Sequence, residues 1–303
     1  MSLVKKFNNK YLIKIGIKLC HWVPRKMGPA MIEPFCSVIA GMKNTDLIKA
    51  VRSNQKVISG DESLPASELD LWTKAVIRHA LTCYYDFFRN IDNPVKMSLL
   101  FPTADELKRE FEQATKTEGP MVTTPHLSNI NLLFQVITKE GFRAKVLTLS
   151  NLYCGYSVIS KIRSQGGAEI VSVEDGSYFN EIVDHLKSGG PVVTSVGRPV
   201  LSRTSRYKVD FFRKPSALPV GYISLAQTAG IPIIIVTTHM ISEGLYEYSF
   251  SEKTYLNKYQ IKLDEMILNV EMILTKIEEL IKRATDQWLM YYPVWPDQGT
   301  QEL

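Results

Sequence analysis

Cysteines are few in this 303-residue sequence, and they stand far apart. Cys20, Cys36, Cys83 and Cys154 form no Cys-x-x-Cys pair, the spacing that zinc sites and redox pairs commonly use. Disulfide frameworks of small secreted proteins are much denser in cysteine. We therefore interpret these residues as reduced thiols of a cytoplasmic protein, and we expect neither a metal site nor a cofactor.

Long uncharged apolar runs are absent as well. No stretch reaches the roughly 18 residues that indicate a membrane-spanning helix. Lysines interrupt the only early apolar run that a cleaved signal peptide could use, so we expect none. The sequence also lacks RNA-binding and helix-turn-helix signatures, and we do not expect nucleic acid as a partner.

The remaining composition is that of an ordinary globular protein, with 45% hydrophobic and 22% charged residues. A chain of this length can bury a sizeable core. We expect a single structural domain with two regions. Residues 1–95 read as a helical N-terminal region, and residues 96–303 read as an α/β core.

Negative charge is missing from residues 1–32, which hold seven lysines and arginines. A basic amphipathic helix over residues 1–26 is typical of a segment that lies in an anionic membrane interface. The alternative is a helix that docks on the core and leaves its lysine face in water. The pattern rests on lysines and apolar residues that recur every fourth position, on adjacent faces of a helix: Lys6, Lys10, Lys14 and Lys18, with Phe7, Tyr11, Ile15 and Leu19.

The order of apolar runs and turn residues predicts an α/β fold with a mostly parallel central sheet flanked by helices. A strand near 245–250 is expected at one side of this sheet, in antiparallel orientation, and a last long helix at 260–283. The expected N-terminal elements are helices at 30–42, 45–58 and 67–89, a short strand near 95–100, and a helix that begins at Thr103. The alternating strands are expected at 120–124, 144–149, 168–173, 191–195 and 231–237, with helices at 128–140, 152–165, 177–187 and 219–229.

A segment of unusual length, residues 197–218, connects two of these elements. It contains six lysines and arginines and one aspartate. A basic loop beside the carboxyl end of a strand could bind an anion as a flap over the sheet edge. The equally open alternative is a solvated loop.

A histidine stands at the turn between the predicted strand at 120–124 and the helix that follows it. Open α/β folds place their chemistry at such an edge of the sheet. His126 is therefore a candidate catalytic residue, although a histidine at this position could also simply cap or pack.

Several short motifs, in this order and spacing, resemble the lysophospholipid acyltransferase-like superfamily, specifically its late lipid A biosynthesis (lauroyl/myristoyl) acyltransferase family. The resemblance covers roughly residues 10–297. Many lipid A acyltransferases have a membrane-spanning N-terminus, whereas this chain is expected to rely on its amphipathic start. The motifs are PHLSN at 125–129, RSQGG at 163–167, LKSGGPVV at 186–193, VDFF at 209–212, PSALPVG at 215–221, LAQTAGIP at 225–232 and DQWLMYYPVW at 286–295.

The resemblance implies direct acyl transfer by the histidine of a His-x4-acidic motif. His126 would act as general base on an acceptor hydroxyl, which then attacks a thioester. The acidic position, however, is Asn131. An asparagine can orient an imidazole by a hydrogen bond but cannot stabilise its protonated form by charge. Asn129 would donate a hydrogen bond to the oxyanion or fix the turn.

A second carboxylate of the family pattern is also missing, because Gly197 stands where many relatives have aspartate before Arg198. Glu174 and Asp175, just past the third strand, are candidate substitutes, and helix capping is the alternative for Asp175. By resemblance, Arg163 and Arg198 would bind phosphate or polarise the thioester carbonyl. Phe211 would line an acyl groove or pack in the core.

Three hypotheses follow. The first is a peripheral acyltransferase at the cytoplasmic face of the inner membrane, which works as a monomer. Its donor would be acyl carrier protein or acyl-CoA, its acceptor a lipid or glycolipid, and its support an anionic membrane surface. The second is a degenerate relative that only binds acyl chains or acyl carrier protein. The third is a specialised acyltransferase for a natural-product or carrier-bound acceptor.

Overall fold

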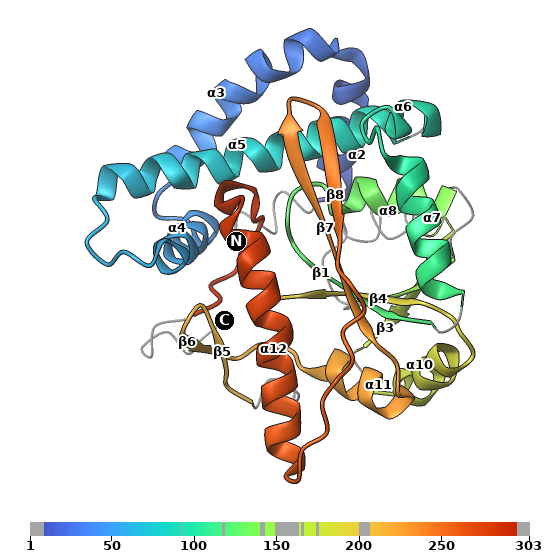
Figure 1. The fold of residues 1–303 in the computed structure, drawn as a ribbon. Coiled ribbons are helices and arrows are strands. Elements are labelled where there is room, and N and C mark those ends of the chain that lie inside the picture. Colours follow the sequence, from blue (N-terminus) through green and yellow to red (C-terminus); the bar gives the residue numbers. More distant parts are fainter. Residues whose placement is uncertain are drawn as a thin grey trace.

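The computed structural model describes residues 9–91, 93–116, 119–139, 143–148, 164, 167–173, 176–199 and 207–295. The predicted α/β fold with a mostly parallel sheet is confirmed (Figure 1). The strand order is β3-β2-β4-β1-β7-β8, and only β8 runs antiparallel to its neighbour. The strands are β1 (Met121–Pro125), β2 (Lys145–Thr148), β3 (Glu169–Ser172), β4 (Val192–Val196), β7 (Ile233–Ser242) and β8 (Leu245–Phe250).

Strand β1 is buried along its whole length because it lies in the middle of the sheet, between β4 and β7. Its last residue, Pro125, pairs with Val196 at the end of β4. The residues that follow these two parallel strands therefore emerge at the same edge. This register places His126 and Arg198 on neighbouring strand ends.

The two faces of the sheet are covered by different helices, because successive strand residues point to opposite faces. One face carries Met121, Val192 and Ile233 and packs against α10 (Tyr178–Lys187), α11 (Gly221–Ala229) and α12 (Lys262–Lys282). The other carries Val122, Val193 and Ile234. It packs against helices of the first half of the chain: α5 (Ala66–Asn90), α6 (Pro94–Ser98), α7 (Ala104–Thr115) and α8 (Ile130–Lys139).

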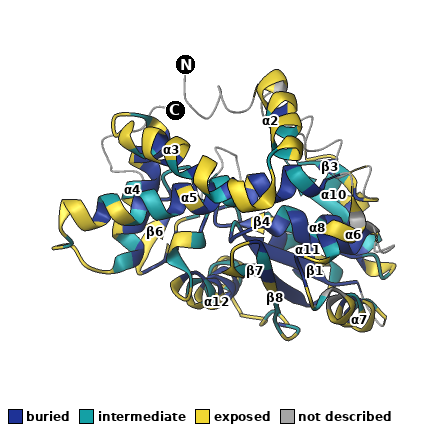
Figure 2. Ribbon diagram, turned by 90° about the horizontal axis from the view of Figure 1, so that it is seen from above, coloured by how far each residue is buried: buried dark blue, intermediate teal, exposed yellow. Residues whose placement is uncertain are grey.

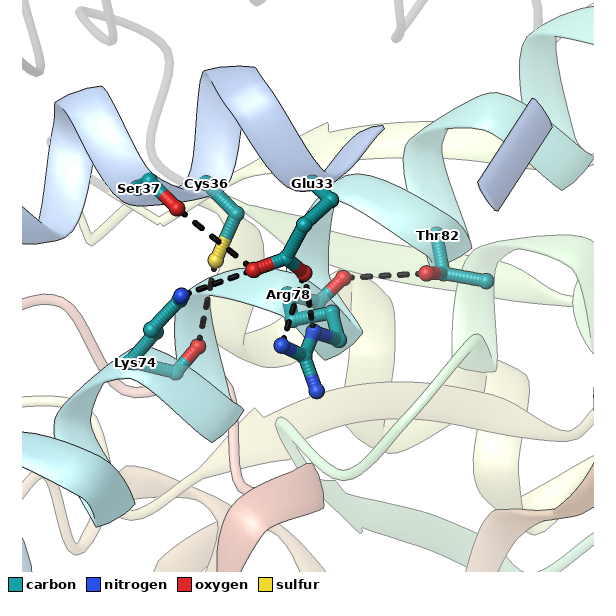
Figure 3. Close-up of polar contacts among 6 residues, drawn as sticks. All are labelled: Glu33, Cys36, Ser37, Lys74, Arg78 and Thr82. Atoms are coloured by element: carbon teal, nitrogen blue, oxygen red, sulfur yellow. Dashed lines mark hydrogen bonds and ion pairs between the residues drawn. The ribbon is translucent and has the colours of Figure 1, made fainter. Parts of the chain in front are cut away.

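The N-terminal helices pack along the long helix α5, which crosses the upper part of Figure 1. They are α2 (Lys10–Trp22), the 3₁₀ turn η1 (Arg25–Met27), α3 (Gly28–Gly41) and α4 (Asp46–Ser59). Glu33 of α3 forms ion pairs of 2.7 Å with Lys74 and Arg78 of α5, and the Cys36 thiol donates to the Lys74 carbonyl oxygen (Figure 3). None of the helices in the part of the chain that the structure describes has the length and apolarity that a membrane crossing needs.

Two expectations from the sequence are wrong. The predicted strand near 95–100 is the short helix α6, capped by Asn93, whose side-chain oxygen accepts from the Lys96 amide at 3.0 Å. The predicted loop at 197–218 contains a hairpin of β5 (Val209–Phe211) and β6 (Lys214–Ser216). Carboxylates of α12 hold this hairpin: the amides of Asp210 and Phe212 donate to Glu271 and Glu278. The predicted helix at 152–165 falls almost entirely outside the described residues.

The C-terminal segment follows the 3₁₀ turn η2 (Thr285–Gln287), and the buried side chain of Asn54 of α4 forms three hydrogen bonds with its backbone. The Asn54 amide donates to the carbonyl oxygens of Met290 (3.2 Å) and Tyr292 (2.8 Å). Its oxygen accepts from the Val294 amide at 3.0 Å. The Asn54 side chain thus binds the aromatic segment through both its nitrogen and its oxygen.

We predict that Asn54→Leu lowers the free energy of unfolding by about 3 kcal/mol, because it leaves buried backbone groups of the segment without partners. Urea unfolding followed by circular dichroism measures this change. Asn44→Leu at an exposed position is the control and should change the free energy by less than about 0.5 kcal/mol. Equal effects of the two substitutions would show that the Asn54 bonds contribute no net stability.

Candidate active site

The turn that carries His126 is held by backbone hydrogen bonds to the C-terminal segment and by a side-chain hydrogen bond from β7. The Leu289 amide donates to the His126 carbonyl oxygen at 2.7 Å, and the Ser128 amide donates to the Gln287 carbonyl oxygen at 2.8 Å. The Thr238 hydroxyl of β7 donates to the Leu127 carbonyl oxygen at 3.1 Å. His126 itself is half-buried. The turn is therefore a rigid part of the sheet edge.

A cluster of buried polar side chains lies beneath this turn; we call it the α5 polar cluster. Ser128, at a φ of 48°, places its hydroxyl 3.0 Å from Nε2 of His79. The Asn129 amide donates to the Cys83 carbonyl oxygen at 3.0 Å and lies 3.4 Å from the Tyr246 hydroxyl. The cluster consists of His79, Cys83 and Asp86 from α5, together with Ser128, Asn129 and Tyr246.

This cluster was not predicted from the sequence. His79, Cys83 and Asp86 are spaced by four and three residues, so they share one face of α5. That face is buried, with relative exposures of 8%, 4% and 3%. Polar residues spaced three or four apart, on the helix face that also carries apolar residues, could have indicated a polar site beneath the helix.

Burial favours the neutral forms of the ionisable members of the cluster. It lowers the pKa of His79 to about 4 and raises the pKa of the Cys83 thiol to about 12. Burial also raises the pKa of Asp86, opposed by the 2.7 Å hydrogen bond from the Tyr246 hydroxyl. A neutral imidazole and a protonated thiol at neutral pH suit a role in holding the turn in place.

Two cavities meet at His126. The first has about 660 Å³ of empty space, including its open mouth, and lies between α8 and the sheet. The second, with about 460 Å³, lies between α5 and the C-terminal segment. Both are lined by His126, Ile130 and Asn131. A histidine shared by two cavities is suited to a reaction that joins two substrates.

The cavities have mixed linings, as small-molecule sites usually do. Hydroxyl groups of Thr124, Thr194 and Ser195 line the first cavity, beside apolar residues of α8 and the sheet. Aromatic rings of Tyr84, Phe87 and Tyr291 line the second. Among the described residues, no group of three or more histidines, cysteines and carboxylates could hold a metal ion.

The structure places the other candidate residues in different surroundings. The Arg198 guanidinium lies over the Tyr292 ring, 4.1 Å from its centroid, and within the described ranges its Nε has no hydrogen-bond partner. Asn129 uses its amide to fix the turn. Phe211 is fully buried in an aromatic cluster with Phe212, Trp288 and Trp295. This position agrees with packing in the core, one of the two alternatives given for Phe211 above. The predicted site residues Arg163, Glu174 and Asp175 lie outside the described residues.

We predict a pH-dependent contribution of His79 to stability. Its pKa is about 4 in the folded state and 6.5 ordinarily, so the unfolded chain binds the extra proton first as pH falls. The contribution is complete above pH 6.5 and is lost as pH falls from 6.5 to 4, by about 3 kcal/mol in total. Urea unfolding at pH 7 and pH 4 should show this loss in the wild type relative to His79→Gln. Parallel pH dependences of the two proteins would contradict it.

The comparison with known families agrees with this geometry. A family model described as bacterial lipid A biosynthesis acyltransferase matches residues 85–296. The matched span contains the His126 turn, both parallel neighbours of β1 and the aromatic C-terminal segment. No curated protein matches the chain. Because the family model covers more than half of the 303 residues, the chain belongs to the bacterial lipid A biosynthesis acyltransferase family.

Proposed function

We propose that this protein moves a fatty acyl group from an acyl carrier protein or acyl-CoA thioester to a hydroxyl or amine of a lipid or glycolipid acceptor, at the surface of a membrane. The observation that carries the proposal is the position of His126 and Asn131. Both residues line two cavities at the carboxyl edge of a parallel sheet, in a chain of the acyltransferase family.

The proposed reaction is a direct transfer. His126 accepts the proton of the acceptor hydroxyl, whose oxygen attacks the thioester carbonyl carbon. The new C–O bond forms, the C–S bond breaks, and the proton on the imidazole passes to the departing thiolate. Arg198, and Arg163 in the same way, would bind an anionic group of a substrate or polarise the carbonyl.

Asn131 orients the imidazole in this proposal but adds no charge. Replacing the orienting aspartate of a serine-protease triad by asparagine costs about four orders of magnitude in turnover. A thioester is a more reactive substrate than an amide, so a less effective general base can suffice. Glu174 or Asp175 would supply the missing charge in the third hypothesis drawn from the sequence.

We predict that His126→Ala reduces thiol release from acyl-CoA or acyl carrier protein by at least about a hundredfold, because the base is lost. Free thiol appearance, followed with a chromogenic disulfide, measures the rate. Saturable donor binding without any turnover that depends on His126 would contradict the proposal and indicate a binding protein.

Asn131→Asp should raise turnover at least about tenfold, because a carboxylate stabilises the imidazolium. Asn44→Asp, at an exposed position, is the matched control. An unchanged rate in Asn131→Asp would favour another acid near His126, as in the third hypothesis.

The proposed membrane contact rests on the exposed apolar residues of α2 and α3 (Figure 2). Helix α2 packs Ile13 and Ile17 against α5, while its other apolar residues stay exposed beside the exposed Lys14 and Lys18. Half of the exposed large hydrophobic side chains in the described part of the chain lie between residues 11 and 42. They are Tyr11, Leu12, Ile15, Leu19, Trp22, Met27, Met31, Phe35, Val38 and Met42.

Helix α3 extends this surface, although the sequence pattern did not indicate it as a membrane-facing helix. Ile32, Cys36 and Ile39 are buried on one side, and an apolar stripe faces away from the core on the other: Met31, Phe35, Val38 and Met42. The carboxylate of Glu33 is neutralised by Lys74 and Arg78 (Figure 3). An exposed apolar stripe beside cationic side chains fits an anionic lipid surface.

We predict that the double variant Phe35→Glu/Val38→Glu binds vesicles of anionic phospholipid at least about tenfold more weakly, because two large side chains no longer enter the lipid. Co-sedimentation measures the binding. The double variant Ile261→Glu/Leu263→Glu, at the N-terminal end of α12, is the matched control. Ile261 and Leu263 are 60% and 48% exposed, and Phe35 and Val38 are 61% and 60% exposed. Equal binding of both double variants would place the contact elsewhere.

A further inference from the structure

Tyr291 lines the second cavity, and its hydroxyl group is buried. His126 and Asn131 line the same cavity. The Tyr291 hydroxyl oxygen has no hydrogen-bond partner among the residues that the structure describes. Buried hydroxyls in folded proteins nearly always have a partner, because an unsatisfied one reduces stability. Phenylalanine would fill the same space without that cost, so the hydroxyl needs an explanation.

The protonation state of Tyr291 limits what the hydroxyl can do. Burial, reinforced by the nearby Tyr84 and Cys83, raises its pKa well above the ordinary value. The phenol therefore stays protonated at neutral pH. It can donate a hydrogen bond but cannot serve as a base there.

The backbone around Tyr291 is fixed before any ligand arrives. Asn54 donates to the carbonyl oxygens of both neighbours, Met290 and Tyr292. The Leu289 amide is bonded to the His126 carbonyl oxygen. The same short segment thus holds both the histidine turn and the phenol, which is the preorganisation that effective transition-state donors require.

We propose that the Tyr291 hydroxyl donates a hydrogen bond to the carbonyl oxygen of the acyl thioester while negative charge develops on it. This inference rests on the proposed acyl transfer. As the acceptor oxygen attacks, the carbonyl π electrons move to that oxygen, and a fixed donor stabilises the charge. A hydrogen bond to the acceptor oxygen would instead reduce its nucleophilicity, which favours the carbonyl oxygen as the partner.

The test is Tyr291→Phe, with Tyr222→Phe as the matched control. Tyr222 of α11 also has a buried hydroxyl without a partner in the described part of the chain, but it packs on the opposite face of the sheet. Tyr291→Phe should lower kcat for thioester turnover about a hundredfold, with little change in KM for the donor and an unchanged or higher Tm. Tyr222→Phe should leave kcat unchanged.

Other outcomes overturn the inference in distinguishable ways. A wild-type kcat in Tyr291→Phe would exclude the donor role but leave the proposed function intact, provided that His126→Ala is inactive. A higher KM for the acceptor at unchanged kcat would assign the hydroxyl to acceptor binding. Absence of any turnover that depends on His126 in the wild type would remove the proposed function, and this inference with it.

Discussion

The hydrogen bond from the Asn129 amide to the Cys83 carbonyl oxygen joins the histidine turn to helix α5, and much of the structure depends on this junction. The same helix holds Glu33 of α3 through Lys74 and Arg78. It therefore contacts the surface helices on one side and the turn on the other. Helix α5, lying between them, fixes the distance from the proposed lipid surface to His126.

Hydrogen bonds of Ser128 offset the backbone strain at the turn. Ser128 adopts a φ of 48°, which costs on the order of 1 kcal/mol for a residue with a side chain. The backbone bond to Gln287 and the side-chain contact with His79 offset this cost. Because the neutral state of His79 comes from its burial, the support would weaken in acid, where the unfolded chain is protonated first. The shape of the turn is thus maintained by hydrogen bonds of Ser128 that do not involve the His126 side chain.

Much of the fold could be predicted from the sequence, because central strands such as β1 and β7 are short apolar runs that can be recognised from their own residues. The hairpin at 209–216 could not, because its amides find their acceptors in Glu271 and Glu278, about sixty residues later. The position of His126 follows from the turn and its proposed role from the resemblance, but the proposed contribution of Tyr291 depends on which cavity this residue lines. The sequence around Tyr291 does not indicate which cavity the residue lines. Helix α6 is not predicted, although Asn93 provides a local cap, because the apolar residues of this segment also fit a strand.

The bonds between Asn54 and the C-terminal segment have a consequence for folding. They join residues separated by 236 and 238 positions in the chain. Contacts of such sequence separation form late, once the intervening elements have reduced the entropy of closing so long a loop. The wall of the second cavity therefore exists only after α12 and the last aromatic residues are in place. A chain still emerging from the ribosome would contain His126 but not the completed wall of this cavity.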